Sequence, residues 1–599
     1  MSGDTEDRSR AAGPGMTRRQ ALQLTLAAGI SATAITFAVT DPAAAAAAGV
    51  FLHGVASGDP QHDRVVIWTR ITQKNPEASI PVRWLVAEDK NMRRIVRRGK
   101  SPARAERDYT VKVDVDGLEV GRAYYYCFEV DGKRSPVGRT RTLPRDDVQK
   151  LKFAVFSCSN YELGYFNAYG EAGTHDDLDA IIHLGDYIYE YGPGLGGYTT
   201  PAAAAGLVPK PRDALLVPAE EIILLEQYRA RHALYRTDGH LQRLHRDNPF
   251  INIWDDHEVA NDTWTDGAGN HQSASEGGWQ ARKRAGIRAF YEWLPIREPD
   301  DGDRIDPKTH RPDDLYRVFD FGDLARLVMI DTRQAGRNEQ LDATALVAAY
   351  TGVPAQGPFP ADVANGRTRT LMGREQEGWF EKRIAESTQT WQLIGNQVLM
   401  FYQATPDILG TSTLTAEQKT QFVGLLDQLL GEGTGALFGQ LGQAGLPFPL
   451  AADAWTGYPS ARIEMLKVLA KAKNPIVLTG DSHNAWTANL ALPGGTEPTP
   501  VGAEFGATSV SSPGYEQELV GAPAALIEGL LVDTSERKSP ADKLIYTDAS
   551  RRGFMLVEVT SKAVTVDHVF VSTALEKTYT TETKRFRVRA GARKAAPVA

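Results

Sequence analysis

Cysteine is nearly absent from this chain, and its scarcity excludes one class of protein at once. Cys127 and Cys158 are the two cysteines among 599 residues, too few for a disulfide-stapled scaffold. There is no Lys/Arg-rich block and the net charge is −8, so we expect no specific nucleic-acid-binding surface. No internal repeat is evident, and no apolar run is long and unbroken enough to predict a transmembrane anchor in the mature protein. What remains is a globular composition, 42% hydrophobic and 24% charged, with a length that allows about two to four domains.

The first 48 residues have the organisation of an export signal. Thr17-Arg18-Arg19-Gln20-Ala21-Leu22 precedes an apolar run from Leu24 to Val39 and a small-residue tract from Ala43 to Ala48. A charged head, a short apolar core and an Ala-x-Ala tail are typical of a signal peptide. The adjacent arginines resemble a twin-arginine (Tat) signal, although Ala21 stands where a bulky residue is usual. An ordinary secretory signal is the alternative. We therefore expect a secreted protein, periplasmic or extracellular, with the Tat export machinery as a partner.

Residues 49–145 have the pattern of a small all-β domain. β-branched and aromatic residues recur in short segments that predict strands, at 64–69, 81–86, 109–115 and 123–130. The last segment ends at Asp131-Gly132, a hairpin signal. Short strands at this spacing predict an immunoglobulin-like β-sandwich. Cys127 falls in such a strand, where we interpret it as a small buried apolar residue; a Cys127–Cys158 disulfide is the less favoured alternative.

From residue 150 to about 575 the pattern changes to that of an α/β domain. Short apolar runs that end in small and polar residues predict buried parallel strands, at 153–156, 180–184, 250–254, 324–330, 391–395 and 475–479. Helical patterns lie between them, at 168–179, 220–244 and 276–294. Residues 192–220 and 350–367 predict long surface loops. Residues 576–599 are interpreted as a basic C-terminal tail.

The segment 412–448 departs from the alternation of strands and helices. Thr415-Ala416-Glu417-Gln418 predicts a helix that begins at residue 416, and a Gly-rich stretch follows it. Two roles stay open for the segment: a helix packed on the sheet, or a lid that narrows a binding site.

Polar residues with chemistry in common follow five of the predicted strands. They are Cys158, Asp186 with Tyr189, Asp256 with His257, Asn396, and Asp481 with His483. Each alone has an ordinary explanation, such as a turn, a cap or a buried histidine. As a set they would meet at one sheet edge, where ligands bind in such folds, and they indicate metal or acid–base chemistry. Carboxylate and amide oxygens favour a hard cation, whereas a thiolate and a phenolate favour a metal such as ferric iron. The sequence therefore predicts a site for two unlike metals.

Three motifs resemble those of a known superfamily. Gly185-Asp186-Tyr187-Ile188-Tyr189 resembles the Gly-Asp-x-x-Tyr motif of purple acid phosphatases and related calcineurin-like metallophosphoesterases. Asp255-Asp256-His257-Glu258 stands where that superfamily has Gly-Asn-His-Glu, and Gly480-Asp481-Ser482-His483 where it has Gly-His-x-His. Cys158 stands where the first strand supplies an aspartate. These departures resemble the PhoD-type alkaline phosphatases, as do the segments 254–262 and 453–459.

The resemblance implies a fold, a metal centre and a reaction. The fold is a metallophosphoesterase α/β sandwich after a β-rich N-terminal domain, and the metals are Fe³⁺ and Ca²⁺. Cys158, Tyr189 and His483 would bind iron, and Asp186 would bridge the two metals. Asp256 and Asp481 would make the second site rich in carboxylate, as calcium prefers.

The resemblance gives the remaining site residues less specific roles. Asn396 would bind calcium or the phosphate, and Asn261 would contact the substrate. Arg333 would either contact phosphate or form an ion pair. His257 would be catalytic, since it would stabilise developing charge or protonate the leaving oxygen.

The implied activity is hydrolysis of phosphate monoesters, and of diesters, by direct attack of a metal-bound hydroxide. A secreted phosphodiesterase or phospholipase D with the same fold and site is the alternative, and a binding protein with a vestigial metal site is a third hypothesis.

Overall fold

The computed structural model describes most of the chain after the predicted export signal. The described residues are 49–73, 77–193, 216–298, 315–341, 346, 369–412, 414–430, 433–447, 452–494, 498–515, 524–539 and 541–598. The predicted signal peptide lies outside them, as do most of the loops predicted at 192–220 and 350–367. Among the helices described, none is long and apolar enough to cross a bilayer.

The N-terminal region forms two antiparallel β-layers around an apolar core. One layer contains β4 (Ile95–Arg104), β3 (Ser79–Ala87), β6 (Ala123–Val130), β7 (Lys133–Arg134) and β8 (Gly138–Arg141). The other contains β1 (Val55–Gly58), β2 (Val65–Arg70) and β5 (Thr110–Val115). Asp131 and Gly132 join β6 to β7 with φ angles of 48° and 73°, the left-handed backbone that a tight hairpin turn requires. The predicted mostly-β N-terminal domain is confirmed.

A ten-stranded sheet continues from this domain into the α/β domain. Its order is β24-β23-β22-β21-β9-β10-β11-β1-β2-β5. The parallel strands β9 (Lys150–Phe156), β10 (Ala180–His183) and β11 (Pro249–Asn252) correspond to the first three predicted strands. β1 pairs in parallel with β11, so the two predicted domains share one sheet. The short helix α3 (Asn167–Ala172) lies on the connection between β9 and β10.

Two strands of this sheet, at 581–589 and 595–597, occupy the region that the sequence predicted as a tail. β21 (Arg552–Thr560), β22 (Ala563–Val571), β23 (Thr581–Arg589) and β24 (Ala595–Pro597) pair antiparallel in succession. Phe586 and Val588 of β23 are buried, whereas the basic residues beside them lie on the other face. The alternation of apolar and basic residues, period two, is that of a half-exposed strand, and the prediction of a basic tail was wrong because it counted charge and ignored this period.

A second sheet holds the other three predicted strands. Its order is β14-β15-β16-β17-β19-β18-β20. β15 (Ala325–Met329), β16 (Trp391–Gly395) and β17 (Pro475–Thr479) run in parallel, and they are joined by β14 (Arg317–Phe321), β19 (Thr499–Gly506), β18 (Ala485–Leu492) and β20 (Lys543–Asp548). The expectation of a single sheet edge is therefore corrected to two sheets, which pack against each other through a shared apolar core. Phe153 of the first sheet meets Phe321 of the second edge to face, with ring centroids 5.0 Å apart.

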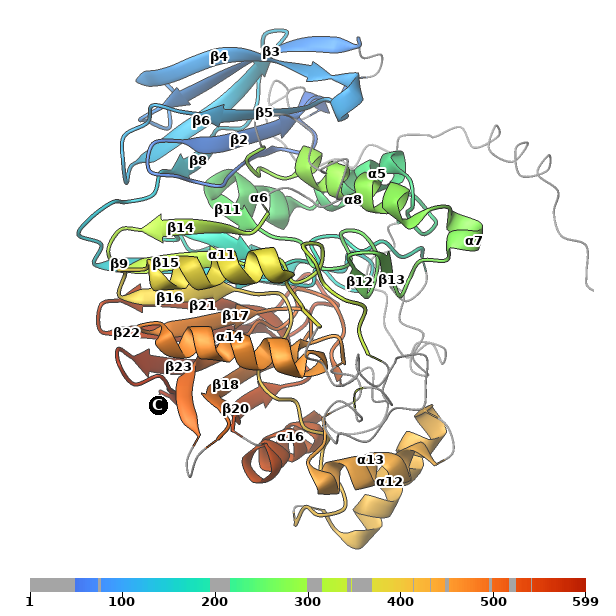
Figure 1. Cartoon of the computed structure of the whole chain (residues 1–599). Coiled ribbons are helices and arrows are strands. Elements are labelled where there is room, and N and C mark those ends of the chain that lie inside the picture. The colour runs from blue at the N-terminus through green and yellow to red at the C-terminus, as the bar shows by residue number, and fades with distance from the viewer. Residues whose placement is uncertain are drawn as a thin grey trace, which may run out of the picture. The chain divides into compact units, whose positions relative to one another are not determined.

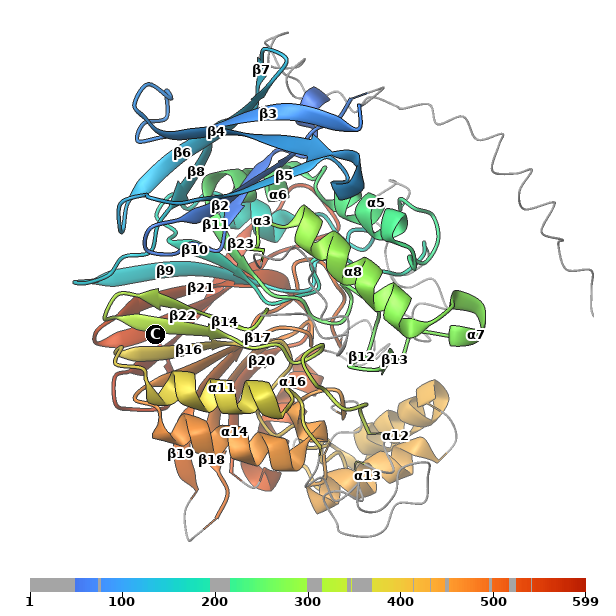
Figure 2. The same ribbon diagram turned by 45° about the horizontal axis from the view of Figure 1, so that its top comes forward.

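Helices cover the outer faces. On the second sheet α11 (Arg374–Ala385) and α14 (Pro459–Lys471) lie side by side (Figure 1). α5 (Leu225–Tyr235) packs against α8 (Trp279–Trp293) (Figure 2). The helix predicted at 220–244 is two helices, because the Asp238 carboxylate accepts hydrogen bonds from the backbone N–H groups of His240 and Leu241 and so starts α6 (Gly239–Asp247). Smaller elements are η1 (Ala105–Arg107), β12 (Thr263–Trp264), β13 (Gly267–Ala268), α7 (Ser273–Glu276) and η4 (Trp455–Gly457).

The segment 412–448 contains two helices, α12 (Ala416–Leu430) and α13 (Thr434–Ala444). The predicted start at residue 416 is confirmed. The Thr415 hydroxyl accepts a bond from the Gln418 backbone N–H at 3.2 Å, and the Gln418 side chain accepts one from the Thr415 N–H at 2.9 Å, a reciprocal capping arrangement. Phe438 of α13 packs with Leu530 of α16 (Ala524–Lys538).

Candidate metal centre

The candidate ligands stand on unusual backbone. Cys158, Asp186, Asp481 and His483 follow β9, β10 and β17 with φ angles of 60°, 54°, 61° and 62°. Left-handed backbone is disfavoured for residues other than glycine, and such strain clusters at functional sites. Gly185, at φ 110°, allows the close approach of the next loop, since a Cβ there would lie 2.4 Å from Asp255. The strand ends therefore hold their polar side chains in positions that ordinary turns would not give.

Side chains from these strand ends converge into a continuous set of donors. Within each of four groups, the possible ligand atoms lie within 4.8 Å of one another. The groups are Cys158 with Asp186 and His483; Asp186 with Asp256 and His257; Asp255 with Asp256 and Asp481; and Asp256 with Asp262 and Asp453. Because Asp186 and Asp256 recur, the groups adjoin. The structure thus brings together five of the predicted metal ligands and the predicted catalytic histidine.

Tyr189 joins the first group. Its hydroxyl lies 3.1 Å from Asp186 Oδ2 and 3.2 Å from His483 Nε2. His483 Nδ1 lies 2.7 Å from the Pro513 carbonyl oxygen, which accepts the Nδ1 proton and leaves Nε2 facing Tyr189 as the acceptor nitrogen. Burial lowers the pKa of His483 to about 3, so the ring is neutral, the form that binds a metal.

The donor set fits metal ions. Burial raises the pKa of Asp186 well above its usual range, and the Asp255 and Asp256 carboxylates raise it further. The pKa of the Cys158 thiol is raised by burial and by Asp186. Asp186 Oδ1 is buried and has no hydrogen-bond partner among the described residues. Crowded acids with an unpaired buried oxygen are stabilised by a polyvalent cation, which both ionises the ligands and fills the missing contact.

His257 is held by Glu190, a residue that the sequence analysis missed. His257 Nδ1 lies 2.7 Å from Glu190 Oε2, and the imidazole stacks on Tyr189 with centroids 4.2 Å apart. Burial lowers the pKa of His257, but Asp256, Glu190 and Asp186 outweigh it and raise that pKa well above the usual value. Glu190 Oε1 also accepts the Asn261 backbone N–H at 2.7 Å. In the sequence, the position of Glu190 directly after Tyr189 was the one feature that could have indicated a role in the site.

Glu258 holds together the loops that follow β10 and β11 through hydrogen bonds to their backbones. Its carboxylate accepts backbone N–H groups of Asp186 at 3.2 Å, Tyr187 at 2.5 Å and Asp255 at 2.8 Å. Burial raises its pKa to about 8. Although Glu258 closes the motif quoted from the sequence, only the structure shows that it positions the ligand loops.

Arg333 forms buried ion pairs, one of the two roles that the sequence left open. Its guanidinium pairs with Asp255, with Asp453 at 2.7 Å and with Asp481 at 2.9 Å. The Arg333 and Asp255 side chains are buried, whereas those of Asp453 and Asp481 are partly exposed. Arg333 thereby supplies positive charge to the carboxylate-rich end of the site, and a contact with phosphate stays a prediction.

The two candidate asparagines have different surroundings. Asn396 Oδ1 accepts the Trp455 indole N–H at 3.2 Å, and its Nδ2 donates to the Val398 carbonyl at 2.6 Å, so both ends of the amide have protein partners. Its role as a metal or phosphate ligand stays a prediction. Asn261 is half-buried, and its backbone N–H donates to Glu190; its contact with a substrate stays a prediction.

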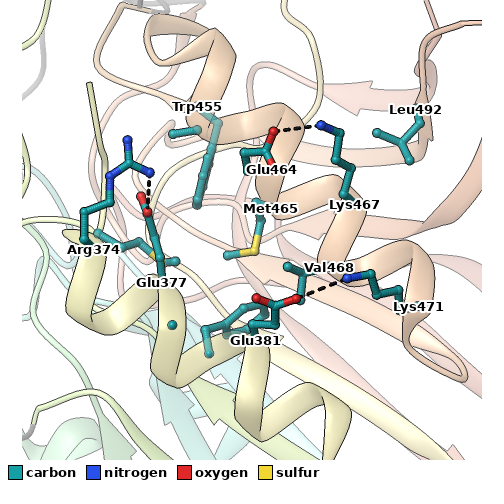
Figure 3. Close-up of a pocket in the computed structure, with 14 residues that line it drawn as sticks. Arg374, Glu377, Glu381, Trp455, Glu464, Met465, Lys467, Val468, Lys471 and Leu492 are labelled. Carbon is teal, nitrogen blue, oxygen red and sulfur yellow. Dashed lines mark hydrogen bonds and ion pairs between the residues drawn. The ribbon is translucent and has the colours of Figure 1, made fainter. Parts of the chain in front are cut away.

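A groove of about 550 Å³ between α11 and α14 is a separate feature (Figure 3). Trp455, Met465 and Val468 contribute apolar surface to it. Its basic side chains pair with carboxylates: Arg374 with Glu377 at 2.8 Å, Lys467 with Glu464 at 2.7 Å, and Lys471 with Glu381 at 3.1 Å. The residues of the four donor groups do not line it, so we place no chemistry there.

Comparisons with known proteins agree with the geometry. The profile of PhoD-like phosphatase matches residues 153–568, and the profile of the PhoD-like phosphatase N-terminal domain matches residues 36–144. Alkaline phosphatase D of Bacillus subtilis (strain 168) is 34% identical over 477 residues, which cover 78% of this chain and 70% of that protein. The solved structure of PhoD aligns with 92% of each chain at 30% identity and a TM-score of 0.72.

Proposed function

The chain belongs to the PhoD-like phosphatase family, and from that premise we propose that it hydrolyses phosphate esters, monoesters first, at a centre of one Fe³⁺ with Ca²⁺. It is an enzyme of the alkaline phosphatase D type, a phosphoric ester hydrolase. The observation that carries the proposal is the convergence of Cys158, Asp186 and His483, with the Tyr189 hydroxyl, at the ends of three strands.

The donor types divide the centre into two unlike parts. Thiolate, phenolate and imidazole are the ligands expected for ferric iron, so we assign Cys158, Tyr189 and His483 to iron. Carboxylates suit calcium, so we assign Asp256 and Asp481 to calcium, with Asp186 shared because it belongs to both neighbouring groups. When bound, these metals would supply Lewis acidity and an acidified water for direct in-line hydrolysis.

The chain's own contribution to the reaction centres on His257. Glu190 holds Nδ1 at 2.7 Å, which leaves Nε2 to protonate the leaving oxygen or to stabilise developing charge. Stacking on Tyr189 fixes the plane of the ring relative to an iron ligand. Glu190, which is not an assigned metal ligand, is among the carboxylates that raise the pKa of His257, the direction that favours a protonated general acid.

Replacing His257 with Ala tests the assignment. We expect turnover to fall by about 10²–10⁴-fold, the usual contribution of a positioned acid or base, with iron and calcium still bound. His271→Ala is the matched control, because His271 lies in the same region but pairs with Glu276 at 3.1 Å. If His257→Ala loses metal in proportion to activity, His257 is a ligand and not the acid.

The metals have their own test. The active protein should contain iron and show a visible thiolate and phenolate charge-transfer band, and a calcium chelator should abolish an activity that added calcium restores. An active preparation without iron or a visible band would overturn the iron assignment. Full activity after long incubation with excess chelator would overturn the calcium assignment.

Substrate preference and export are further parts of the proposal. A panel of chromogenic monoesters and diesters separates phosphatase from phosphodiesterase or phospholipase D activity.

We propose that residues 1–48 direct Tat-dependent export, since the paired Arg18 and Arg19 precede the apolar run. An Arg18→Lys, Arg19→Lys double variant should then remain in the cytoplasm of a host with a Tat system, and unchanged export would exclude this route.

A further inference from the structure

One short segment contacts all three residues that we assign to iron. This segment, here called the serine strap, is Thr508–Pro513 and follows β19. We propose that Ser512 of the strap is a positioning residue that donates a hydrogen bond to the Tyr189 oxygen and so sets the electronic character of the iron site. The inference rests on the proposed function, because it concerns the same iron.

The strap binds backbone on two different strand ends. The backbone N–H groups of Ser511 and Ser512 both approach the Cys158 carbonyl at 3.4 Å, and Val510 N–H donates to the Ser157 carbonyl at 3.1 Å. On the other side, the Ser509 backbone N–H donates to the His483 carbonyl at 3.2 Å. The ends of β9 and β17 are therefore tied to one another through the strap.

The strap also contacts ligand side chains. The Pro513 carbonyl accepts the His483 Nδ1 proton at 2.7 Å, which orients that imidazole. The Ser512 hydroxyl lies 2.7 Å from the Tyr189 oxygen and 3.1 Å from the Cys158 carbonyl. Since a hydroxyl has one proton, the shorter contact identifies Tyr189 as its acceptor when that oxygen is charged.

Ionisation of Tyr189 makes this bond stronger. A phenolate bound to a metal has no proton to donate and accepts hydrogen bonds only, and bonds to a charged acceptor are short and roughly twice as strong as neutral ones. Ser512 is fully buried and Tyr189 nearly so, so bulk water does not compete. The Ser512 hydroxyl therefore binds most strongly to the ionised form of Tyr189, which is the form that would bind iron.

The bond has a spectroscopic consequence. A hydrogen bond stabilises the filled orbitals of the phenolate, so more energy is needed to transfer an electron from it to ferric iron. Removing the bond should therefore move the charge-transfer band to longer wavelength. Loss of a partner that orients a metal ligand also weakens metal affinity by about 10–100-fold.

Two serines of the strap give a matched pair of variants. Ser512→Ala removes the donor to Tyr189. Ser511→Ala removes a neighbouring buried hydroxyl that donates to the Asn160 carbonyl at 2.7 Å. Ser512→Thr keeps a hydroxyl at the position of interest. Each variant is purified as the full chain, its fold is checked by circular dichroism, and its absorption spectrum and rate of iron loss to a chelator are measured.

We expect a longer-wavelength band and about 10–100-fold easier iron loss in Ser512→Ala, with wild-type behaviour in Ser511→Ala and recovery in Ser512→Thr. A folded Ser512→Ala with the wild-type band and iron retention would overturn the inference, and so would an equal shift in both alanine variants. If Ser512→Ala does not fold, Ser512→Cys, a weaker donor, should give a smaller shift of the same sign, and no shift would overturn the inference. Wild-type protein without iron would overturn the proposed function instead.

Discussion

A buried histidine that belongs to none of the four donor groups should make the protein sensitive to acid. His232 of α5 stacks on Trp293 with centroids 6.4 Å apart, and neither ring nitrogen has a hydrogen-bond partner among the described residues. Burial, with the nearby Arg236 charge, lowers the pKa of His232 to about 3. An imidazole in the unfolded chain titrates near 6.5. At pH values between these two pKa values, the imidazole of His232 is protonated in the unfolded chain and neutral in the folded protein.

The sign and the size of the effect follow from this difference. The stability contributed by neutral His232 is fully present above the unfolded pKa and is lost as the pH falls from about 6.5 towards about 3. One pKa unit corresponds to about 1.4 kcal/mol, so about 2 kcal/mol is lost at about pH 5. With an unfolding entropy of about 2.1 cal/mol/K per residue, a chain of this length should lose about 2 °C in melting temperature through this one group.

The perturbation is His232→Phe, which keeps an aromatic ring and removes the titration. Its melting temperature should fall less than that of the wild type between about pH 7.5 and about pH 5, by about 2 °C. Comparing the two pH values cancels any constant packing effect of phenylalanine. The melting temperature of His245→Phe should show the same reduced dependence on pH. It should also be lower than that of the wild type at both pH values, because the substitution removes the contact of His245 Nε2 with the Tyr187 hydroxyl at 2.9 Å. Exposed His240→Gln is the control. Equal losses in His232→Phe and wild type would refute the reasoning.

Three further predictions concern the site and its surroundings. Glu190→Gln should lower kcat by about 10–100-fold at unchanged metal content, because a hydrogen bond to a charged group contributes about 1.5–3 kcal/mol; kinetics with elemental analysis measure this, and parallel loss of metal would contradict it. Arg333→Gln should lower the free energy of unfolding by about 3–5 kcal/mol, the usual effect of breaking a buried ion pair, and an unchanged thermal transition would disprove it. Replacing residues 434–444 with a Gly/Ser linker should keep metal content and alter the ratio of activities on large and small substrates, whereas an unchanged ratio in folded protein would exclude a lid.

Much of the α/β domain could be predicted because its strands are short apolar runs that end in small and polar residues. All six predicted strands exist, and Asp186, Asp256 and Asp481 follow three of them. The division into two sheets was not predictable, since strands buried on both faces look alike whichever sheet they join. The strands at the C-terminal end were missed because their basic residues alternate with apolar ones such as Phe586.

Motif residues of the site were predicted, but their partners were not. Cys158 and His483 lie more than three hundred residues apart in the chain, and the sequence associates them only through strand ends and a family resemblance. Glu190 and Ser512 have no motif of their own. Their roles depend on contacts at 2.7 Å with His257 and with Tyr189, and residues distant in sequence give no sign of such contacts.

The sequence by itself determined the six apolar strands, the motif residues of the centre and the family, because these depend on periodicity, turn chemistry and short motifs. Tertiary structure alone decided which carboxylates share a site, that Arg333 neutralises several of them in the interior, and that the serine strap joins the ends of β9 and β17. The physical reason is that burial and proximity set charge and hydrogen bonding. Both arise from the packing of two sheets, which brings strand ends together across the length of the chain.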